Sequence, residues 1–460
     1  MRARREISSE PQEAKIFSKK INVNINRERK KMNAAELKDA VMSGEFDTVL
    51  ERIYINCVKE RKERICKAID DFTKIYGDRE GMMVLSVPGR SEISGNHTDH
   101  NYGKVVAGSV DCDILAIAAP TETGCVRIKS EGYPIDEVSL DKLKVGDYPN
   151  FKSSALVAGM CKAFLDKGYK VGGIDAYTTS NVLKGSGLSS SAAFEVMIGN
   201  MINHVYNEGK VANEEIAIMA QWSENVYFGK PCGLMDQMAC AVGGFINIDF
   251  ADKENPVIVK KEFDLSSYGY ALCIVNTGGS HSDLNDDYAS IPADMKSVAR
   301  YFGKEVLRGI SVDELILEGK AIREKCSDRA WLRAYHYVLE NERVDVISEA
   351  MDEGNIDLFL EYIEKSGLSS YRYLQNVYSA HHSEEQGISL ALALSEHIFA
   401  SYKGDKKPVC RVHGGGFAGT MQAFVPEEFT KQYREGIDSV FGEGACMIMH
   451  VRPLGAIRIG

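Results

Sequence analysis

The sequence lacks several patterns that would assign it to other classes of protein. Its eleven cysteines include no Cys-x-x-Cys pair, so neither a thiolate zinc site nor a disulfide framework is indicated, and a reducing cytoplasm is the expected location. No apolar run approaches the roughly 20 residues that span a bilayer, and nothing resembles a signal peptide. No Walker A sequence occurs, which excludes the usual phosphate loop with its lysine.

A basic charge balance is also missing. The net charge is −11, so we expect no nucleic-acid partner and no membrane partner. Hydrophobic residues make up 44% and charged residues 26% of the 460 positions, as in ordinary globular proteins. This length can bury a core large enough for two domains, and we expect a monomer or a weak homo-oligomer.

The first 80 residues differ from the rest in composition. Residues 1–31 carry ten Lys or Arg against four Asp or Glu, with few apolar residues and no periodicity. We interpret them as a disordered basic tail, or as sequence upstream of a true start at Met32. Four glutamates make a transit peptide the less favoured reading. Residues 32–80 are predicted to form a helical N-terminal extension.

Two further domains are predicted after the extension, over residues 81–250 and 251–460. The first contains short strand patterns at Met83–Val87, Ile114–Ala119 and Val126–Ser130, helices near the middle, and a closing strand near Gly244–Phe250. The second contains long helical stretches between Asp294 and Ala400 and a strand at Thr420–Val425.

A glycine- and serine-rich loop is the most informative segment. A strand pattern at Gly173–Val182 leads into Gly185-Ser186-Gly187-Leu188-Ser189-Ser190-Ser191, and helical spacing begins at the serines. Glycines let a backbone approach phosphates closely, and a helix N-terminus offers unpaired N–H groups and a positive dipole end. The alternative is an ordinary serine-capped helix, but two glycines followed by three serines favour a phosphate site.

Two other segments concentrate polar groups. Pro88-Gly89-Arg90 and Gly95-Asn96-His97-Thr98-Asp99-His100 place a guanidinium, an amide, two imidazoles and a carboxylate after a strand, a density suited to binding a polyol. A metal at His97, Asp99 and His100 is disfavoured by their tight spacing. The segment Gly414–Gly419 fits Gly-x-Gly-x-x-Gly but lacks the following βαβ context, so a dinucleotide fold is rejected.

Asp236 is the carboxylate with the most unusual surroundings in the sequence. It lies among Leu234, Met235, Met238 and Ala239, shortly after Glu224 in a predicted helix. Carboxylates in apolar settings are candidates for catalysis. On local grounds, a helix-capping aspartate after Gly233 remains an equal alternative.

Taken together these segments resemble the galactokinases, which belong to the GHMP kinase superfamily. The matching blocks begin with Gly89-Arg90…Gly95-Asn96-His97-Thr98-Asp99 and the Gly185–Ala192 loop, and they continue with Pro231–Gln237, Asn276–Tyr288 and His413–Gly419. One block alone is weak, whereas five in order are specific. The resemblance implies a two-domain α+β fold with the active site in the inter-domain cleft.

The resemblance also implies roles for individual residues. Asp236 would face the anomeric hydroxyl of a sugar as base or acceptor, and Arg90 would hold it ionised. Ser191 and Glu224 would hold Mg²⁺, and the Gly185–Ser191 loop would wrap the phosphates of ATP, with Ser130 at the edge of the nucleotide pocket. The residues expected to hold the sugar hydroxyls are Asn96, His97, Asp99, Asp236 and Tyr288.

The sequence departs from the family at the sugar signature. Position 96 is Asn where the family has Glu, and position 92 is Glu where the family has Asn. The resemblance implies ATP-dependent phosphorylation of D-galactose to α-D-galactose 1-phosphate, and these departures leave the choice of sugar less fixed than the kinase activity. The alternatives are the same chemistry on N-acetylgalactosamine, L-arabinose or galacturonate, or a sensor that binds galactose and ATP without turnover.

Overall fold

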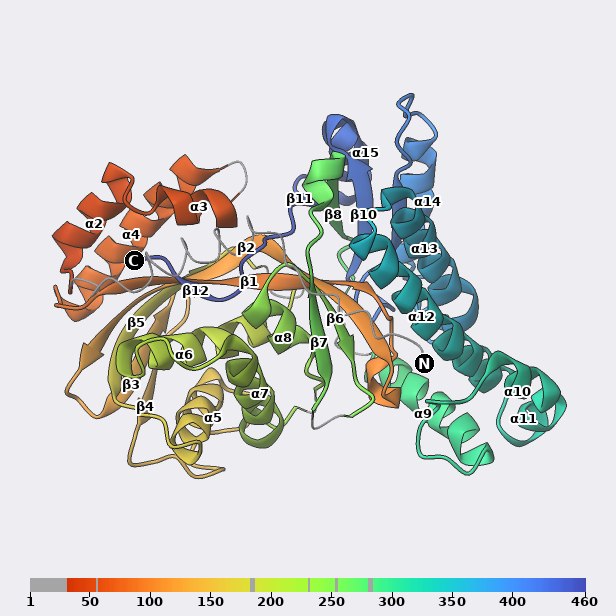
Figure 1. Ribbon diagram of the computed structural model, residues 1–460, viewed down its shortest axis with the longest axis horizontal. Helices are drawn as coiled ribbons and strands as arrows, with labels where there is room; N and C mark the ends of the chain where they lie inside the picture. Colours follow the sequence, from red (N-terminus) through yellow and green to blue (C-terminus); the bar gives the residue numbers. More distant parts are fainter. Residues whose placement is uncertain (1–30, 55–56, 183–186, 231, 253–254, 280–283) are drawn as a thin grey trace, which may run out of the picture.

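A computed structural model describes residues 31–460 except 55–56, 183–186, 231, 253–254 and 280–283. The described residues form two β-sheets with helices packed on them (Figure 1). The larger sheet has eight strands in the order β12-β1-β2-β5-β3-β4, and β6 and β7 extend it from β2. Its strands are β1 (Met83–Ser94), β2 (Lys104–Thr121), β3 (Cys125–Ser130), β4 (Ile135–Ser139), β5 (Gly173–Ser180), β6 (Phe245–Asp249), β7 (Val257–Lys261) and β12 (Ile457–Arg458).

The larger sheet is covered by helices on both faces (Figure 1). One face carries α2 (Ala34–Ser43), α3 (Asp47–Ile53) and α4 (Val58–Tyr76), and the other carries α5 (Ser153–Asp166), α6 (Ser190–Tyr206), α7 (Asn213–Ser223) and α8 (Met235–Val242). Alternation along β2 explains how one strand serves both faces. Leu115, Ile117 and Ala119 join the core under α2–α4. Ile114, Ala116 and Ala118 join the core under α5–α8.

The smaller sheet has four antiparallel strands in the order β11-β8-β10-β9. They are β8 (Tyr270–Asn276), β9 (Val409–Val412), β10 (Thr420–Pro426) and β11 (Cys446–Met449). The C-terminal helices are α9 (Asn285–Tyr301), α10 (Val312–Leu317), α11 (Gly319–Lys325), α12 (Asp328–Asp352), α13 (Ile356–Ser369), α14 (Gly387–Phe399) and α15 (Thr430–Phe441). The short turns are η1 (Asp99–Asn101), η2 (Glu224–Phe228), η3 (Leu265–Tyr268), η4 (Ser370–Leu374) and η5 (Glu427–Phe429).

Several predicted element boundaries were wrong, including that of the strand predicted at Ile114–Ala119, which is part of the longer β2. The strand predicted at Met83–Val87 continues to Ser94, because register shifts between Pro88 and Arg90 and between Glu92 and Ser94 let β1 stay paired with β2. The helical spacing near Glu214–Phe228 predicts one helix, but α7 ends at Ser223 and the chain continues as the π-helical turn η2. The helical region expected from Asp294 begins at Asn285, with Pro292 inside α9.

The order of elements leaves the domain division open. β7 extends the larger sheet beyond residue 250, and β12 returns to pair with β1 from the C-terminal end of the chain. The division into residues 32–80, 81–250 and 251–460 stays a prediction. All eleven cysteines lie in the described residues and are free thiols. Among the described residues, no helix has both the length and the apolarity needed to cross a membrane.

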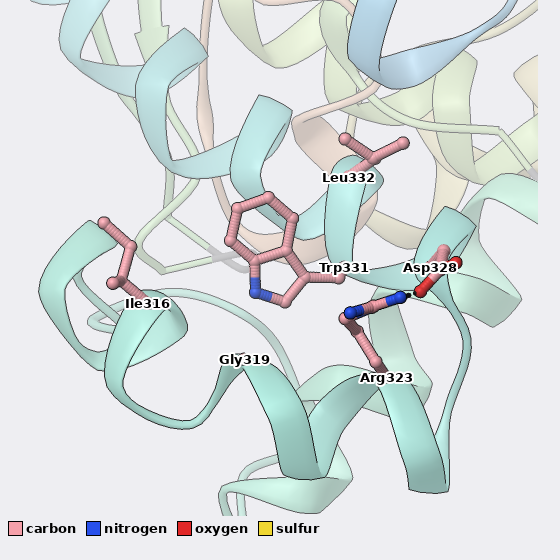
Figure 2. A pocket seen from close by; sticks show the side chains of 6 residues that line it. All are labelled: Ile316, Gly319, Arg323, Asp328, Trp331 and Leu332. Carbon is pink, nitrogen blue, oxygen red and sulfur yellow. Dashed lines mark hydrogen bonds and ion pairs between the residues drawn. The ribbon is translucent and has the colours of Figure 1, made fainter.

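Helices α10–α12 form the outer end of a helical arm (Figure 1). A shallow cavity at this end has a volume of about 480 Å³. Figure 2 shows the residues that line it. The cavity is lined by Ile316, Gly319, Arg323, Asp328, Trp331 and Leu332. The Trp331 indole donates a hydrogen bond of 2.8 Å to the Leu315 carbonyl, which fixes the ring along one wall. None of these lining residues belongs to the motifs singled out in the sequence.

Candidate active site

An ion pair between Arg90 and Asp236 lies at the centre of the site. Arg90 Nε donates to Asp236 Oδ1 at 2.7 Å, and Arg90 Nη2 donates to Asp236 Oδ2 at 2.7 Å. Arg90 comes from the irregular part of β1, where the register shift re-aims the side chain, and Asp236 comes from the first turn of α8. The Ser189 hydroxyl also donates to Asp236 Oδ2. The two parallel hydrogen bonds from Arg90 fix the orientation of the Asp236 carboxylate and also stabilise its ionised form.

The Asp236 carboxylate is ionised but still accessible. Burial by itself raises the pKa of Asp236, but the charge and hydrogen bonds of Arg90, with the bond from Ser189, hold that pKa below its usual range. The Asp236 side chain is 34% exposed, whereas that of Arg90 is 8% exposed. The helix-capping alternative does not describe this geometry, because Leu234 is the N-cap of α8 and both Asp236 oxygens are bound to Arg90. The ionised carboxylate of Asp236 is therefore partly accessible from solvent.

The described part of the serine loop runs from Gly187 into α6. Gly187 has a φ of +71°, and a Cβ there would lie 2.9 Å from Thr420 Oγ1 and 3.0 Å from His413 Nδ1, so only glycine fits. Ser189 adopts a left-handed conformation with φ 57°, and Ser190 and Ser191 open α6. A strained non-glycine residue at a helix start is typical of functional turns.

The remaining predicted nucleotide residues are placed less centrally. Leu188 is buried, and its carbonyl accepts a hydrogen bond of 3.1 Å from the Arg90 backbone N–H. Gly185 and Ser186 lie outside the described residues. Ser130 ends β3, and its hydroxyl accepts a hydrogen bond of 2.9 Å from Thr178 on the neighbouring β5. The structure therefore brings Leu188 and Ser189 to the ion pair but keeps Ser130 on a strand beside it.

Of the two residues predicted to hold Mg²⁺, Ser191 lies in the first turn of α6 and Glu224 begins η2, directly after α7. The Glu224 carboxylate receives Lys230 Nζ at 3.2 Å and Gln237 Nε2 at 2.8 Å. The buried Oε1 atoms of Glu195 and Gln237 have no hydrogen-bond partner among the described residues. Acceptor oxygens without donors beside a carboxylate fit a hydrated hard cation. In the same part of the chain, no group of three or more His, Cys, Asp or Glu side chains is arranged to hold a metal.

The predicted sugar residues divide into an accessible set and a buried one. His97, Asp99 and Tyr288 are partly exposed. His97 adopts a φ of 58°, and its Nε2 lies 2.9 Å from the Gly415 carbonyl. Asp99 lies against Gly233, three residues before Asp236, because a Cβ on Gly233 would be 2.8 Å from Asp99 Oδ2. The Tyr288 hydroxyl donates to the Gly416 carbonyl at 2.8 Å.

Asn96 is fully buried, and its amide is engaged within the protein. Its Nδ2 donates to Glu92 Oε1 at 2.9 Å and to the Gly414 carbonyl at 2.6 Å. Its Oδ1 accepts from Asn376 at 2.7 Å and from Ser370 at 3.3 Å. A direct contact between Asn96 and a sugar stays a prediction. It requires Asn96 to replace one of these internal hydrogen bonds with a hydrogen bond to the sugar.

Sequence reasoning missed several polar residues that support this site. Arg411 is buried and contacts Glu92 Oε1 at 3.4 Å, although burial still raises the pKa of Glu92 to about 7. His413 donates to or accepts from Thr420 Oγ1 at 2.9 Å, and burial, with the nearby charges of Arg90 and Arg411, lowers its pKa to about 3. Only the glycines around His413 marked this turn in the sequence. Glu195 carried a weak signal, since it follows Ser191 by one helical turn.

Known families match two segments of the chain. Residues 155–244 match the GHMP kinases N terminal domain, and residues 70–120 match the galactokinase galactose-binding signature. The first match contains the serine loop and Asp236, and the second contains Arg90 and the segment from Asn96 to Asp99. Both parts of the Arg90–Asp236 pair therefore lie in matched segments.

Individual proteins extend the likeness over most of the chain. A galactokinase of Clostridium tetani is 29% identical over 385 residues, covering 81% of this chain and 92% of that protein. The fold matches Lactococcus lactis galactokinase, solved with galactose, with a TM-score of 0.70 and 23% identity over 84% of this chain and 98% of that one. Methanococcus jannaschii mevalonate kinase matches with a TM-score of 0.57 and 13% identity over 80% of this chain and 98% of that one.

The fold expected from the sequence, an α+β GHMP kinase fold, is confirmed by these structures. The resemblance to the galactokinases is confirmed by the two matched segments and by the curated relative. The chain is therefore similar to the galactokinases of the GHMP kinase family over most of its length.

Proposed function

We propose that the protein transfers the γ-phosphoryl group of ATP to the anomeric hydroxyl of D-galactose, giving α-D-galactose 1-phosphate. The observation that carries this proposal is the bidentate Arg90–Asp236 pair beside the N-terminus of α6. It places an ionised carboxylate next to a helix start that attracts anions. The galactokinase of Clostridium tetani, 29% identical, supports the choice of reaction.

Asp236 would act on the attacking hydroxyl. Its ionised oxygens can accept the hydroxyl hydrogen, either as general base or as the acceptor that orients the hydroxyl toward the phosphate. Its partial exposure leaves room for that contact. Arg90 would keep the carboxylate ionised until the proton is transferred and would offset negative charge that develops during transfer.

The start of α6 would receive the phosphates. Backbone N–H groups at Ser189, Ser190 and Ser191 lie at the positive end of a helix of 17 residues. Gly185, Ser186, Gly187 and Leu188 would complete the loop, and Ser130 would border the nucleotide. When bound at Ser191 and Glu224, Mg²⁺ would neutralise phosphate charge.

His97, Asp99 and Tyr288 would hold the sugar hydroxyls on the accessible side of the ion pair. In the structure, all hydrogen-bonding positions of the Asn96 side chain are used within the protein. This favours a second candidate function, in which the amide does not select a C6 hydroxyl and the same chemistry acts on L-arabinose, galacturonate or N-acetylgalactosamine. We place the activity in the cytoplasm, which the free thiols support.

ATP consumption measured with Mg²⁺ across a sugar panel tests the proposal. The panel contains galactose, N-acetylgalactosamine, arabinose, galacturonate and glucose, and we expect the highest kcat/KM with galactose. A preference for another of these sugars would transfer the proposal to that sugar. ATP binding without turnover on any sugar would contradict the kinase proposal and favour a sensor.

A further inference from the structure

A buried polar cluster lies directly behind the predicted Mg²⁺ residues. Glu195 follows Ser191 by four residues on α6, so both side chains lie on the same face of that helix. Glu195 and Gln237 are 0% exposed and Glu224 is 2% exposed. The cluster joins three helical elements, because Glu195 is on α6, Glu224 begins η2 and Gln237 is on α8.

A single amide group connects the two buried carboxylates. Gln237 Nε2 donates to Glu195 Oε2 at 3.1 Å and to Glu224 Oε2 at 2.8 Å. Within the described residues, Lys230 forms an ion pair with Glu224, and the Lys230 side chain is 56% exposed. The amide fixes how the two carboxylates face each other, but it does not use all of their oxygens.

Two oxygens of this cluster are left over. Glu195 Oε1 and Gln237 Oε1 are buried, and in the described part of the chain neither has a donor. Buried acceptors without donors are few in native structures, and an ion or ordered water beside them is one physical reason for keeping them. Gln237 Oε1 can only accept a hydrogen bond, and therefore its missing partner must be a donor. Glu195 Oε1 accepts one when its carboxylate is ionised, although burial and the neighbouring charge of Glu224 raise the pKa of Glu195.

Bound Mg²⁺ brings such donors with it. The ion holds octahedral geometry and keeps several water molecules, and each of these water molecules donates hydrogen bonds. We propose that Glu195 and Gln237 are positioning residues that accept hydrogen bonds from the water molecules of a Mg²⁺ ion held at Ser191 and Glu224. This inference rests on the proposed kinase function, and it adds an outer set of residues to the cation site.

The arrangement also connects the cation to the sugar-facing carboxylate. Gln237 directly follows Asp236 in the first turns of α8, and Asp236 is held by Arg90 and Ser189. A cation that orders Gln237 through its water molecules thereby orders the helix turn that carries Asp236. Outer residues of metal sites typically change metal affinity by about 10–100-fold when they are replaced.

The test uses Mn²⁺ in place of Mg²⁺, with binding to the protein–ATP complex followed by electron paramagnetic resonance. Glu195→Gln removes the charge at nearly constant size, and we expect its Kd for Mn²⁺ to rise about tenfold. The matched control is Asn200→Ala on the same helix, since Asn200 is also buried with an unpartnered Oδ1 but belongs to no part of the cluster. The control should bind Mn²⁺ with a Kd within twofold of the wild-type value. Both variants should bind galactose with a Kd within twofold of the wild-type value.

An unchanged Mn²⁺ affinity in Glu195→Gln would overturn the inference, and so would an equal loss in Asn200→Ala. If Glu195→Gln does not fold, Gln237→Met removes the other unpartnered oxygen and is expected to show the same loss of Mn²⁺ affinity. Wild-type turnover with galactose is recorded on the same samples. Absent wild-type turnover counts against the kinase proposal, whereas full turnover with unchanged Mn²⁺ affinity in the variant counts against this inference alone.

Discussion

The side-chain amide of Asn96 donates a hydrogen bond of 2.9 Å to the carboxylate of Glu92, four residues earlier in the chain. Glu92 is in β1 and Asn96 follows the end of that strand, so the bond closes the bend between strand and loop. Arg411 from β9 contacts the same Glu92 oxygen at 3.4 Å. The contact between Arg411 and Glu92 therefore joins the two sheets.

Substitutions at Glu92 and Asn96 should have non-additive effects on the free energy of unfolding. Asn96→Glu alone places a second carboxylate beside Glu92 in a buried position, and we expect a loss of about 2–3 kcal/mol in the free energy of unfolding. The double variant Glu92→Asn, Asn96→Glu restores one amide and one carboxylate and should recover at least half of that loss. Urea unfolding of all four proteins in a double-mutant cycle measures the coupling, and additive effects would contradict it.

Glu92 should make stability depend on pH. Burial raises its pKa to about 7 in the folded protein from an ordinary value of 4.5. Because the folded pKa is the higher one, the favourable contribution is complete below about pH 4.5 and is lost as the pH rises through 7. At about 1.4 kcal/mol for each pKa unit, the loss amounts to about 3 kcal/mol.

Glu92→Gln removes this titration. Between pH 5 and pH 8, its free energy of unfolding should fall by about 2.5 kcal/mol less than that of the wild type. Urea unfolding of both proteins at several pH values gives the comparison, and the difference between them cancels groups that titrate in both. Parallel curves for the two proteins would show that Glu92 is ionised throughout this range.

Arg90→Lys should move the pH profile of catalysis. Lysine cannot form the two parallel hydrogen bonds that Arg90 makes to Asp236, so the pKa of Asp236 should rise. The acid limb of kcat/KM should therefore shift to higher pH, and kcat should fall about 10²-fold. Steady-state kinetics from pH 5 to 9 measure both effects, and an unshifted acid limb would separate Arg90 from the ionisation of Asp236.

Arg64 should stabilise the packing of the helical extension on the larger sheet. Arg64 Nη1 on α4 lies 2.6 Å from the fully buried Asp113 of β2, which also accepts hydrogen bonds from Tyr54 and Ser86. Arg64→Met should lower the free energy of unfolding by about 3 kcal/mol, because the remaining buried carboxylate loses a partner. Lys38→Met breaks an exposed pair with Asp70 in the same extension and should cost less than about 1 kcal/mol. Equal losses in both variants would contradict a special role for Arg64.

Local patterns in the sequence made part of this structure predictable. The start of α6 was predictable because glycines, serines and helical spacing occur together within one short segment. The extension of β1 to Ser94 was not, because its later residues are polar and their pairing with β2 depends on two register shifts. Helix α9 continues through Pro292, which local rules treat as a break.

Contacts between distant segments were the hardest to predict. Asp236 was a candidate on its apolar neighbours alone, but its partner Arg90 lies 146 residues away in the chain. The burial of Asn96 depends on Gly414 and Asn376, more than 270 residues later. Without an aligned family pattern, no periodicity or spacing reports such contacts, since they are set by how the two sheets meet.

The position of the transferred phosphate tests the central claim most directly. The protein is incubated with ATP, Mg²⁺ and galactose, and the product is identified by ³¹P nuclear magnetic resonance, with Asp236→Ala in parallel. The account predicts a single phosphomonoester on C1 in the α configuration, and no product from Asp236→Ala although it still binds ATP. A phosphate on another carbon, free phosphate released at the same rate without sugar, or full turnover by Asp236→Ala would contradict it.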